Sequence, residues 1–437
     1  MKKLITLVFA LTALLCITAS AETLGGDCGY YGGDNIKWSY DSETKALTFT
    51  GEGIMADYYA HTYTPWYKLN VETITIGDGI TTLGINNLQF MSSVTSVHLP
   101  DTLTLVKDEQ TFSGFYGLKE FNIPAGLTSL DFLLSNLNLR MSPISPVVTV
   151  DQANPAFSSE NGLLYDKNKT VLYYCPPSAS VKNLVLPDSL KSISDYVFYG
   201  HTDMESVSLP EGLIHIGASA FRGCENLTEI NLPESLTELG DSAFSGCSSL
   251  VSVNIPSGVT KIPANLFAHC TSLEFVALPE GITSVGGWVF EYCRSLRSVY
   301  IPDSALTVGG HTFYSCTSLE SVQLPSGLTY LNDSMFDGCT ALRSVELPKG
   351  ITTIGNTVFS GCTSLKSIVI PENVTNMLYG GFMGCTNLES VYLPSSLESM
   401  ALNIFEDCPS LTIYAAPGSR GELYAEECSI PFMFIVI

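Results

Sequence analysis

The sequence predicts a solenoid, a stack of short coils of equal length around one elongated core. Between residues 184 and 411 a strand-like segment followed by proline recurs every 23 residues, and a fixed period of about 20–50 residues is typical of solenoids. Ten prolines mark the copies: Pro187, Pro210, Pro233, Pro256, Pro279, Pro302, Pro325, Pro348, Pro371 and Pro394. Ten phenylalanines keep the same step: Phe198, Phe221, Phe244, Phe267, Phe290, Phe313, Phe336, Phe359, Phe382 and Phe405.

The first half of each coil should contain two short extended segments. In the copy that begins at Leu227, the apolar residues Ile230 and Leu232 are separated by polar ones, which predicts a short strand with one buried face. Pro233 ends that strand because it has no N–H to donate to a neighbouring strand. A second apolar pair within residues 236–239 predicts a second extended segment.

The second half of each coil should turn the chain back to the core. Ala243 and Phe244 would point inward on a single turn of helix or 3₁₀ helix, and Gly246 would allow a corner with positive φ. Cys247 then returns the chain to the interior. One coil cannot bury enough apolar surface to be stable alone, so stacking must supply the stability. The predicted fold is therefore a right-handed, β-rich solenoid with parallel strands and with caps over both end coils.

Nine of the thirteen cysteines occupy one slot of the repeat: Cys224, Cys247, Cys270, Cys293, Cys316, Cys339, Cys362, Cys385 and Cys408. Neighbouring Cα atoms about 4.8 Å apart would permit disulfides, but parallel Cβ vectors disfavour them. The same slot holds His201 and Phe115 in other coils, which indicates a packing role. We therefore expect buried free thiols, with bridged pairs as the alternative. A metal is not expected, because no coil adds a second ligand beside the thiol.

Residues 1–21 have the features of a signal peptide. Two lysines precede the apolar run 4–17, and the small residues Ala19 and Ala21 suggest cleavage after Ala21. A membrane anchor is the competing interpretation, but the run is too short to span a bilayer. Cys16 could mark a lipoprotein, although Leu15 stands where a small residue is expected. We predict a secreted or cell-surface protein without membrane insertion.

The net charge of the chain is −23 at pH 7. An acidic surface with few basic residues argues against partners such as nucleic acids and anionic membranes. Charged residues make up only 14% of the chain, which suits an exported β-rich scaffold.

The remaining chain divides into segments that flank the regular coils. Residues 22–70 should form an N-terminal cap with a β-hairpin, whose aromatic residues could alternatively be a binding surface, and residues 71–130 hold degenerate coils. Residues 131–183 read as irregular coils with a projecting hairpin, or alternatively as a break between two domains. Regular coils occupy 184–414, and residues 415–437 should form a C-terminal cap with a helix and a final strand.

The pattern Leu-x-x-Ile-x-Leu-Pro-x-x-Leu, continued to Ala-Phe-x-Gly-Cys, stands almost complete in residues 227–247. It resembles the leucine-rich repeats of the BspA-like family of surface proteins. The N-terminal segment with Cys28, Trp38 and residues 64–67 is also similar to that family. The resemblance implies a leucine-rich repeat fold and a role in adhesion, host-matrix binding or co-aggregation. The sequence departs from the pattern at the glycine slot, which holds His269, Tyr292, Ser315 and Asp407 in four coils.

Binding residues are expected on the outward face of the first strands. Ser and Asn are the commonest residues at the outward positions, and the aromatic exceptions on this face are Phe275, Tyr300 and Tyr392, with His98 in a degenerate coil. Exposed aromatic side chains are typical contact anchors, although isolated ones need no explanation. We take these four as candidate ligand-binding residues, with Phe275 and Tyr300 on adjacent rungs.

Nothing in the sequence predicts catalysis or a cofactor. No Gly-x-Ser-x-Gly motif, phosphate-binding loop or zinc motif is present, and His201 is better interpreted as a core residue than as a ligand. We expect a monomer that binds an extracellular protein or glycan, such as a component of the host matrix, through its sheet face. A passive envelope scaffold is the alternative, and a hydrolase with its site in residues 131–183 is a more distant one.

Overall fold

The computed structural model describes residues 23–30, 33–59, 64–108, 111–130 and 146–435. They form two compact units: residues 1–146 with 151–154, and residues 147–150 with 155–437. The predicted signal peptide with its cleavage after Ala21, and residues 131–145 of the irregular stretch, lie outside the described residues. Each unit is a solenoid of parallel rungs, which confirms the predicted fold class.

The first unit has two sheets that run along its stack of coils. The larger sheet has the order β1-β2-β3-β5-β7-β9, and the smaller has the order β4-β6-β8. The strands are β1 (Thr23–Asp27), β2 (Ile36–Asp41), β3 (Ala46–Gly51), β4 (Gly53–Ile54), β5 (Thr73–Ile76), β6 (Ile80–Leu83), β7 (Ser96–His98), β8 (Leu105–Val106) and β9 (Glu120–Ile123). β2 and β3 form the expected hairpin, and β3 then pairs in parallel with β5.

Aromatic residues fill the core beside this hairpin. Trp66 is completely buried, and its ring makes edge contacts with Trp38 and Phe49 at centroid distances of 5.7 and 4.9 Å. The indole nitrogen of Trp66 donates to the carbonyl of Asn87 at 2.8 Å. These rings therefore pack inside the unit and are not an exposed binding surface.

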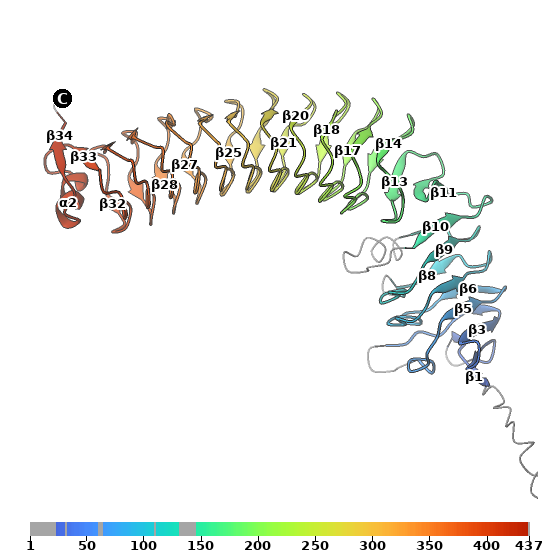
Figure 1. Cartoon of the computed structure of the whole chain (residues 1–437). Coiled ribbons are helices and arrows are strands. Elements are labelled where there is room, and N and C mark those ends of the chain that lie inside the picture. Colours follow the sequence, from blue (N-terminus) through green and yellow to red (C-terminus); the bar gives the residue numbers. More distant parts are fainter. Residues whose placement is uncertain (1–22, 31–32, 60–63, 109–110, 131–145, 436–437) are drawn as a thin grey trace, which may run out of the picture. The chain divides into compact units, whose positions relative to one another are not determined.

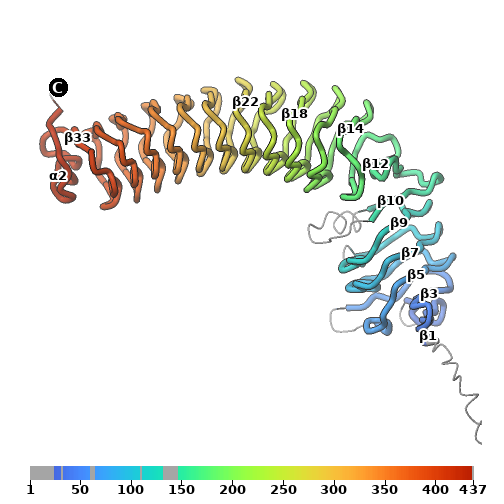
Figure 2. Tube along the Cα trace, in the orientation of Figure 1, coloured from blue at the N-terminus to red at the C-terminus, as the bar shows by residue number. Residues whose placement is uncertain are grey.

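The second unit stacks its rungs in a single row, from β13 to α2 in Figures 1 and 2. The first strands of its coils are β14 (Asn183–Val185), β16 (Ser206–Ser208), β18 (Glu229–Ile230), β20 (Ser252–Asn254), β22 (Phe275–Ala277), β24 (Ser298–Tyr300), β26 (Ser321–Gln323), β29 (Ser367–Val369), β31 (Ser390–Tyr392), β33 (Thr412–Ala415) and β34 (Phe432–Phe434). Their parallel pairing is interrupted after β18, β22 and β26. Neighbouring strands from β14 to β31 within each group pair residues 23 apart, as the period predicts, whereas β31 with β33 and β33 with β34 pair residues 22 and 19 apart.

The second strands form another column of short parallel pairs. They are β15 (Ser192–Ile193), β17 (His215–Ile216), β19 (Glu238–Leu239), β21 (Lys261–Ile262), β23 (Ser284–Val285), β25 (Thr307–Val308), β27 (Tyr330–Leu331), β28 (Thr353–Ile354), β30 (Asn376–Met377) and β32 (Ser399–Met400). Before them, β11 (Phe157–Glu160), β12 (Leu163–Asp166) and β13 (Val171–Tyr174) pair antiparallel, after the short strand β10 (Val147–Val150). Because β13 pairs in parallel with β15, the expected hairpin is built into this sheet instead of projecting from it.

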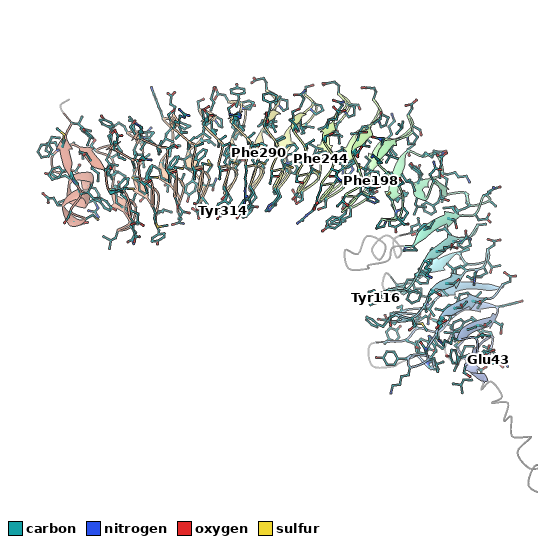
Figure 3. All side chains as sticks on the ribbon, viewed as in Figure 1. Glu43, Tyr116, Phe198, Phe244, Phe290 and Tyr314 are labelled. Atoms are coloured by element: carbon teal, nitrogen blue, oxygen red, sulfur yellow. The ribbon has the colours of Figure 1, made fainter. Side chains whose placement is uncertain are left out.

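The repeated phenylalanines form a continuous stack through the interior, where Phe198, Phe244 and Phe290 are labelled in Figure 3. Adjacent ring centroids from Phe198 to Phe405 are 5.0–6.0 Å apart, and the ring planes are within 25° of parallel. Offset stacking of this kind is favourable beyond the burial of the rings.

The repeated cysteines are free thiols, and all but the last are fully buried. Each Sγ–H donates to the backbone carbonyl of the phenylalanine in the preceding coil, at Sγ–O distances of 2.9–3.2 Å. The thiols therefore pack as predicted and also satisfy a buried carbonyl. Burial raises the pKa of Cys247 well above its usual range, so the thiol stays protonated and unreactive.

The expected helical turn takes the form of consecutive β-turns. Ser245 N–H bonds to the Ser242 carbonyl at 3.0 Å, and Cys247 N–H bonds to the Phe244 carbonyl at 3.1 Å. Ser242 and Gly246 both have positive φ, 59° and 75°, which prevents a continuous helix. Their N–H groups instead bond to carbonyls of the next coil, at Ala264 and Ala268. The left-handed conformation thus serves contact between coils.

The helix and final strand expected after the last coil are both present. α2 (Arg420–Glu427) is capped by Ser419, whose side chain accepts from the backbone N–H of Glu422. Tyr424 of this helix is buried against Phe405, the last ring of the stack, at 5.9 Å. β34 pairs in parallel with β33.

We predict that native protein resists thiol reagents at the buried cysteines. Unfolding in guanidinium without reductant should then make all twelve thiols of residues 23–435 reactive, because none of these twelve is bridged in the part of the chain that the structure describes. A colorimetric thiol titration before and after unfolding measures the number of reactive thiols in the native and in the unfolded protein. Recovery of only a few thiols from the unfolded chain would mean that the cysteines are cross-linked.

Removal of one ring from the stack should destabilise the protein strongly. Phe290→Ala should cost about 3–5 kcal/mol, because it leaves a cavity between two rings in a rigid column. The matched control is Phe275→Ala, since Phe275 is 53% exposed and should cost less than about 0.5 kcal/mol. Urea unfolding followed by circular dichroism compares the two variants, and equal losses would contradict the stack.

His201 should make the protein sensitive to acid. This residue occupies the cysteine slot and is buried, which confirms it as a core residue, and burial lowers its pKa below the ordinary 6.5. The unfolded chain therefore binds the proton more readily, so stability is full above about pH 6.5 and falls as the pH drops below it. Urea unfolding at pH 7.5 and 5.5 measures this loss of stability. The substitution His201→Phe should remove the part of the loss that comes from protonation of His201. An unchanged pH dependence in the variant would exclude His201 as its source.

Candidate functional site

A run of apolar side chains in register lies on the first sheet of the second unit. We call it the apolar row, and it consists of Val369, Tyr392, Tyr414 and Met433. Adjacent members pair directly across β29, β31, β33 and β34. Val369, Tyr392 and Met433 are 65%, 37% and 56% exposed. A contiguous apolar surface of this kind is uncommon on a protein that contacts only water.

The two tyrosines give the apolar row a rigid centre. The rings of Tyr392 and Tyr414 stack with centroids 4.7 Å apart and planes 19° from parallel. Beside them a second row of hydroxyls follows the same strands, with Ser390 in register with Thr412. Stacked rings lose little freedom when a partner covers them, so they suit a contact site.

The other predicted site residues are placed separately. Phe275 is exposed in register with Ser252, whereas Tyr300 is 42% exposed in register with Gln323. They therefore belong to different rows of the face, although their rungs are adjacent. The Tyr300 hydroxyl donates to Glu280 at 3.4 Å. His98 is exposed on β7 of the first unit, where its Nε2 lies 3.2 Å from the Ser96 hydroxyl.

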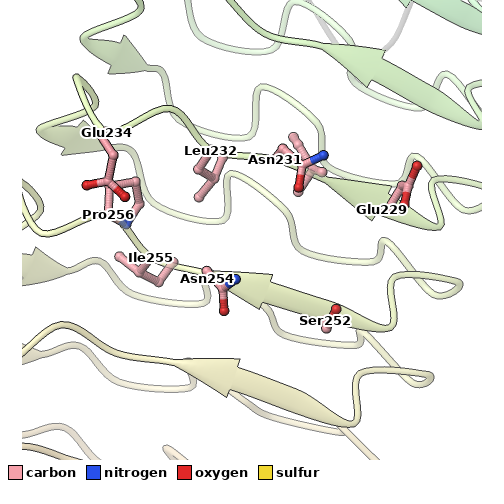
Figure 4. A pocket seen from close by; sticks show the side chains of 9 residues that line it. Glu229, Asn231, Leu232, Glu234, Ser252, Asn254, Ile255 and Pro256 are labelled. Carbon is pink, nitrogen blue, oxygen red and sulfur yellow. The ribbon is translucent and has the colours of Figure 1, made fainter. Parts of the chain in front are cut away.

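Two shallow depressions lie where the first sheet of the second unit is interrupted. One, between β18 and β20, has a volume of about 240 Å³ and is lined by polar groups that include Glu229, Asn231, Glu234 and Asn254. Figure 4 shows Glu229 and Glu234 at opposite ends of it, so the two carboxylates do not converge. The other, about 610 Å³, lies beside Gln323, Glu346 and Lys349. Both offer hydrogen-bonding groups without a reactive constellation.

A second group of aromatic residues lies at the turns of three successive coils. We call it the aromatic cluster: His269, Trp288, Tyr292, His311 and Tyr314. Trp288 stacks on His311 at 5.1 Å, and His269 stacks on Tyr292 at 4.9 Å. Tyr314 touches both pairs, with its centroid 5.5 Å from Tyr292 and 5.9 Å from His311. Figure 3 shows Tyr314 at the edge of the coils, away from the phenylalanine stack.

Four members of the aromatic cluster have an unfavourable backbone conformation. His269, Trp288, Tyr292 and His311 have φ between 56° and 62°. Their N–H groups bond to carbonyls of the next coil, as in most other repeats, which holds them there. A left-handed residue with a Cβ costs roughly 1–2 kcal/mol relative to glycine. Most other coils place Gly, Ser, Asn or Thr at these two slots, with Tyr196 and Asp407 as the exceptions, so the fold does not require an aromatic side chain there.

Sequence reasoning found Tyr392 but missed most of both surfaces. Tyr414 and Met433 follow Tyr392 at steps of 22 and 19 residues, so a strict 23-residue alignment loses them. The aromatic cluster could have been found from the sequence. Trp288 and His311 share one slot of the repeat, and His269 and Tyr292 share another.

Metal-binding clusters and membrane-spanning helices are both absent from the part of the chain that the structure describes. Within it, no group of three or more His, Cys, Asp or Glu side chains is arranged to hold a metal ion. No helix there has the length and apolar character that crossing a membrane requires.

Comparison with solved structures supports the fold. A leucine-rich repeat protein from Eubacterium ventriosum is similar with a TM-score of 0.50 and 22% identity, over 78% of this chain and 95% of that one. One from Bacteroides ovatus has a TM-score of 0.48 and 23% identity, over 95% and 98% of the two chains. A leucine-rich cell surface protein from Faecalibacterium prausnitzii has a TM-score of 0.32 and 21% identity, over 90% and 96%.

Comparison with protein families is more specific. No curated protein matches the chain significantly. The family model described as a BspA type leucine-rich repeat region matches six times, over residues 63–144, 169–297 and 288–412. These matches cover most of the sequence, and they agree with the repeat motif quoted above. The chain therefore belongs to the family of proteins with BspA-type leucine-rich repeats.

Proposed function

We propose that this protein is an exported, adhesin-like binding module that engages an extracellular protein through the apolar row. The observation that carries the proposal is the register of Val369, Tyr392, Tyr414 and Met433, of which Tyr414 is half-buried and the other three are exposed. Phe275 and Tyr300 would add separate contacts on the same sheet face, and His98 is a candidate contact of the first unit. Residues 1–21, with the features of a signal peptide, support an extracellular location.

The surroundings of the apolar row specify the chemistry of the partner. Ser367, Ser390 and Thr412 supply hydroxyls beside the row, which suits a hydrogen-bonding rim around an apolar centre. Lys366 is already paired with Glu389 at 3.7 Å, and the protein carries a net charge of −23. The complementary surface is therefore an apolar patch on a neutral or basic protein.

The test is binding of the purified chain to a panel of immobilised extracellular-matrix proteins, measured by biolayer interferometry. At least one member should bind, and the double substitution Val369→Ser with Tyr392→Ser should weaken that binding at least about tenfold, or about 1.4 kcal/mol. For a basic partner, higher salt should slow association, because salt screens the attraction to the acidic chain.

Val185→Ser is the matched control. Val185 is 76% exposed at the corresponding position of β14, away from the apolar row. Its substitution should leave binding unchanged. If no panel protein binds, or if the control and the double variant bind equally, the apolar row is not the contact site and a passive scaffold becomes the better interpretation.

A further inference from the structure

The aromatic cluster at the turns is a surface that the proposed protein contact does not use. Its residues lie in the coils that span residues 265–316. Within each coil they belong to the turns, whereas the outward positions described above belong to the first strand. Trp288 is 42% exposed and His269 is also exposed. Since neither the fold nor the apolar row requires these rings, their accumulation needs a separate explanation.

Backbone geometry makes the accumulation informative. Trp288 and Tyr292 have φ of 56° and 57°, a conformation that is unfavourable for bulky side chains. At the same slots the coil that contains Phe244 uses Ser242 and Gly246, which carry the turn without a large side chain. The left-handed conformation is shared by most coils at these slots, so it is the bulky side chains, and not the conformation, that set the cluster apart.

The arrangement leaves ring faces open. Trp288 and His311 stack on one another, but the same slot is occupied by Asn265 in the coil before and by Ser334 in the coil after. Both are short, so no ring covers the outer face of Trp288. In the same way Gly246 precedes His269 at its slot, which leaves the outer face of the imidazole uncovered.

The chemistry of the cluster selects one class of ligand. Every ring in it carries an N–H or O–H group, and no aliphatic side chain belongs to it, so it does not resemble the apolar centre of a protein interface. A pyranose ring presents apolar C–H groups to the negative face of an aromatic ring and hydroxyls around its rim. Polar groups for those hydroxyls are close by. Glu291 lies 3.9 Å from His269, and the Arg294 guanidinium lies 5.6 Å from the Tyr292 centroid.

We propose that the aromatic cluster is a carbohydrate-binding platform for a neutral polysaccharide, with one sugar ring stacked on the outer face of Trp288. Acidic neighbours such as Glu291, together with the negative net charge, disfavour uronic-acid and sulfated chains. Within the two stacked pairs the ring centroids are 4.9 and 5.1 Å apart.

Trp288 provides a direct measurement. The protein has three tryptophans, and Trp38 and Trp66 are 9% and 0% exposed, so Trp288 dominates quenching of fluorescence by acrylamide. The full chain is titrated with mannan, xylan, mixed-linkage β-glucan and chitin oligosaccharides, with alginate as the anionic comparison. At least one neutral glycan should bind with Kd below about 1 mM and should protect Trp288 from the quencher, whereas alginate should not.

Two substitutions test the platform without threatening the fold. Trp288→Ser and Tyr292→Gly introduce residues that other coils use at the same slots, and each should weaken glycan binding at least tenfold in calorimetry. Val185→Ser, on the sheet face and 76% exposed, is the matched control and should bind normally. Circular dichroism melts establish that all variants are folded.

The proposal is overturned if none of the neutral glycans binds, if only alginate binds, or if the two cluster variants bind as well as the control. It is also overturned if the two substitutions abolish binding to a matrix protein while no glycan binds, since the cluster would then be a protein contact. Because the variant with Val369→Ser and Tyr392→Ser should retain glycan binding, failure of this proposal is distinct from failure of the protein contact.

Discussion

Contact between identical positions of successive coils is the interaction on which the structure of the second unit depends. A period of 23 residues without insertion places each phenylalanine over the next. It also places each cysteine thiol within hydrogen-bond distance of the carbonyl of the phenylalanine in the preceding coil. The Sγ–O distance is 3.1 Å at both Cys270 and Cys293. Each coil contributes one ring and one donor, and neither is satisfied without its neighbour. Stability is therefore a nearest-neighbour property, which a single coil cannot have.

The same register that builds the core also determines the surface. When a residue faces outward in one coil, its counterparts in the adjacent coils face outward beside it. Tyr392 consequently stacks on Tyr414, and Trp288 stacks on His311, without any special loop to bring them together. A substitution at one slot changes one position in a row, and several substitutions at neighbouring slots produce a continuous patch. Binding surfaces on this scaffold are therefore extended along the stack.

The period made the core predictable but left other features hidden. Parallel strands, buried phenylalanines and buried thiols follow from repetition, because only an inward position needs the same apolar residue in every coil. The thiol-to-carbonyl bond could not be predicted, since it depends on which carbonyl the turn brings within reach. Pairing of β13 with β15 was hidden because residues 157–174 do not follow the period. Tyr414 was missed because its step from Tyr392 is 22 residues.

Departures from the repeat are therefore the most informative residues for function. A core position that departs, such as His201, is constrained by packing and must still fit the slot. A turn position has no such constraint, and there the backbone favours Gly, Ser or Asn because φ is positive. Random drift at such a slot should give small polar residues, whereas Trp288 and Tyr292 oppose the local conformational preference. Rings at adjacent slots also contact one another, and this joint presence, which the fold does not require, is the reason that we propose a ligand there.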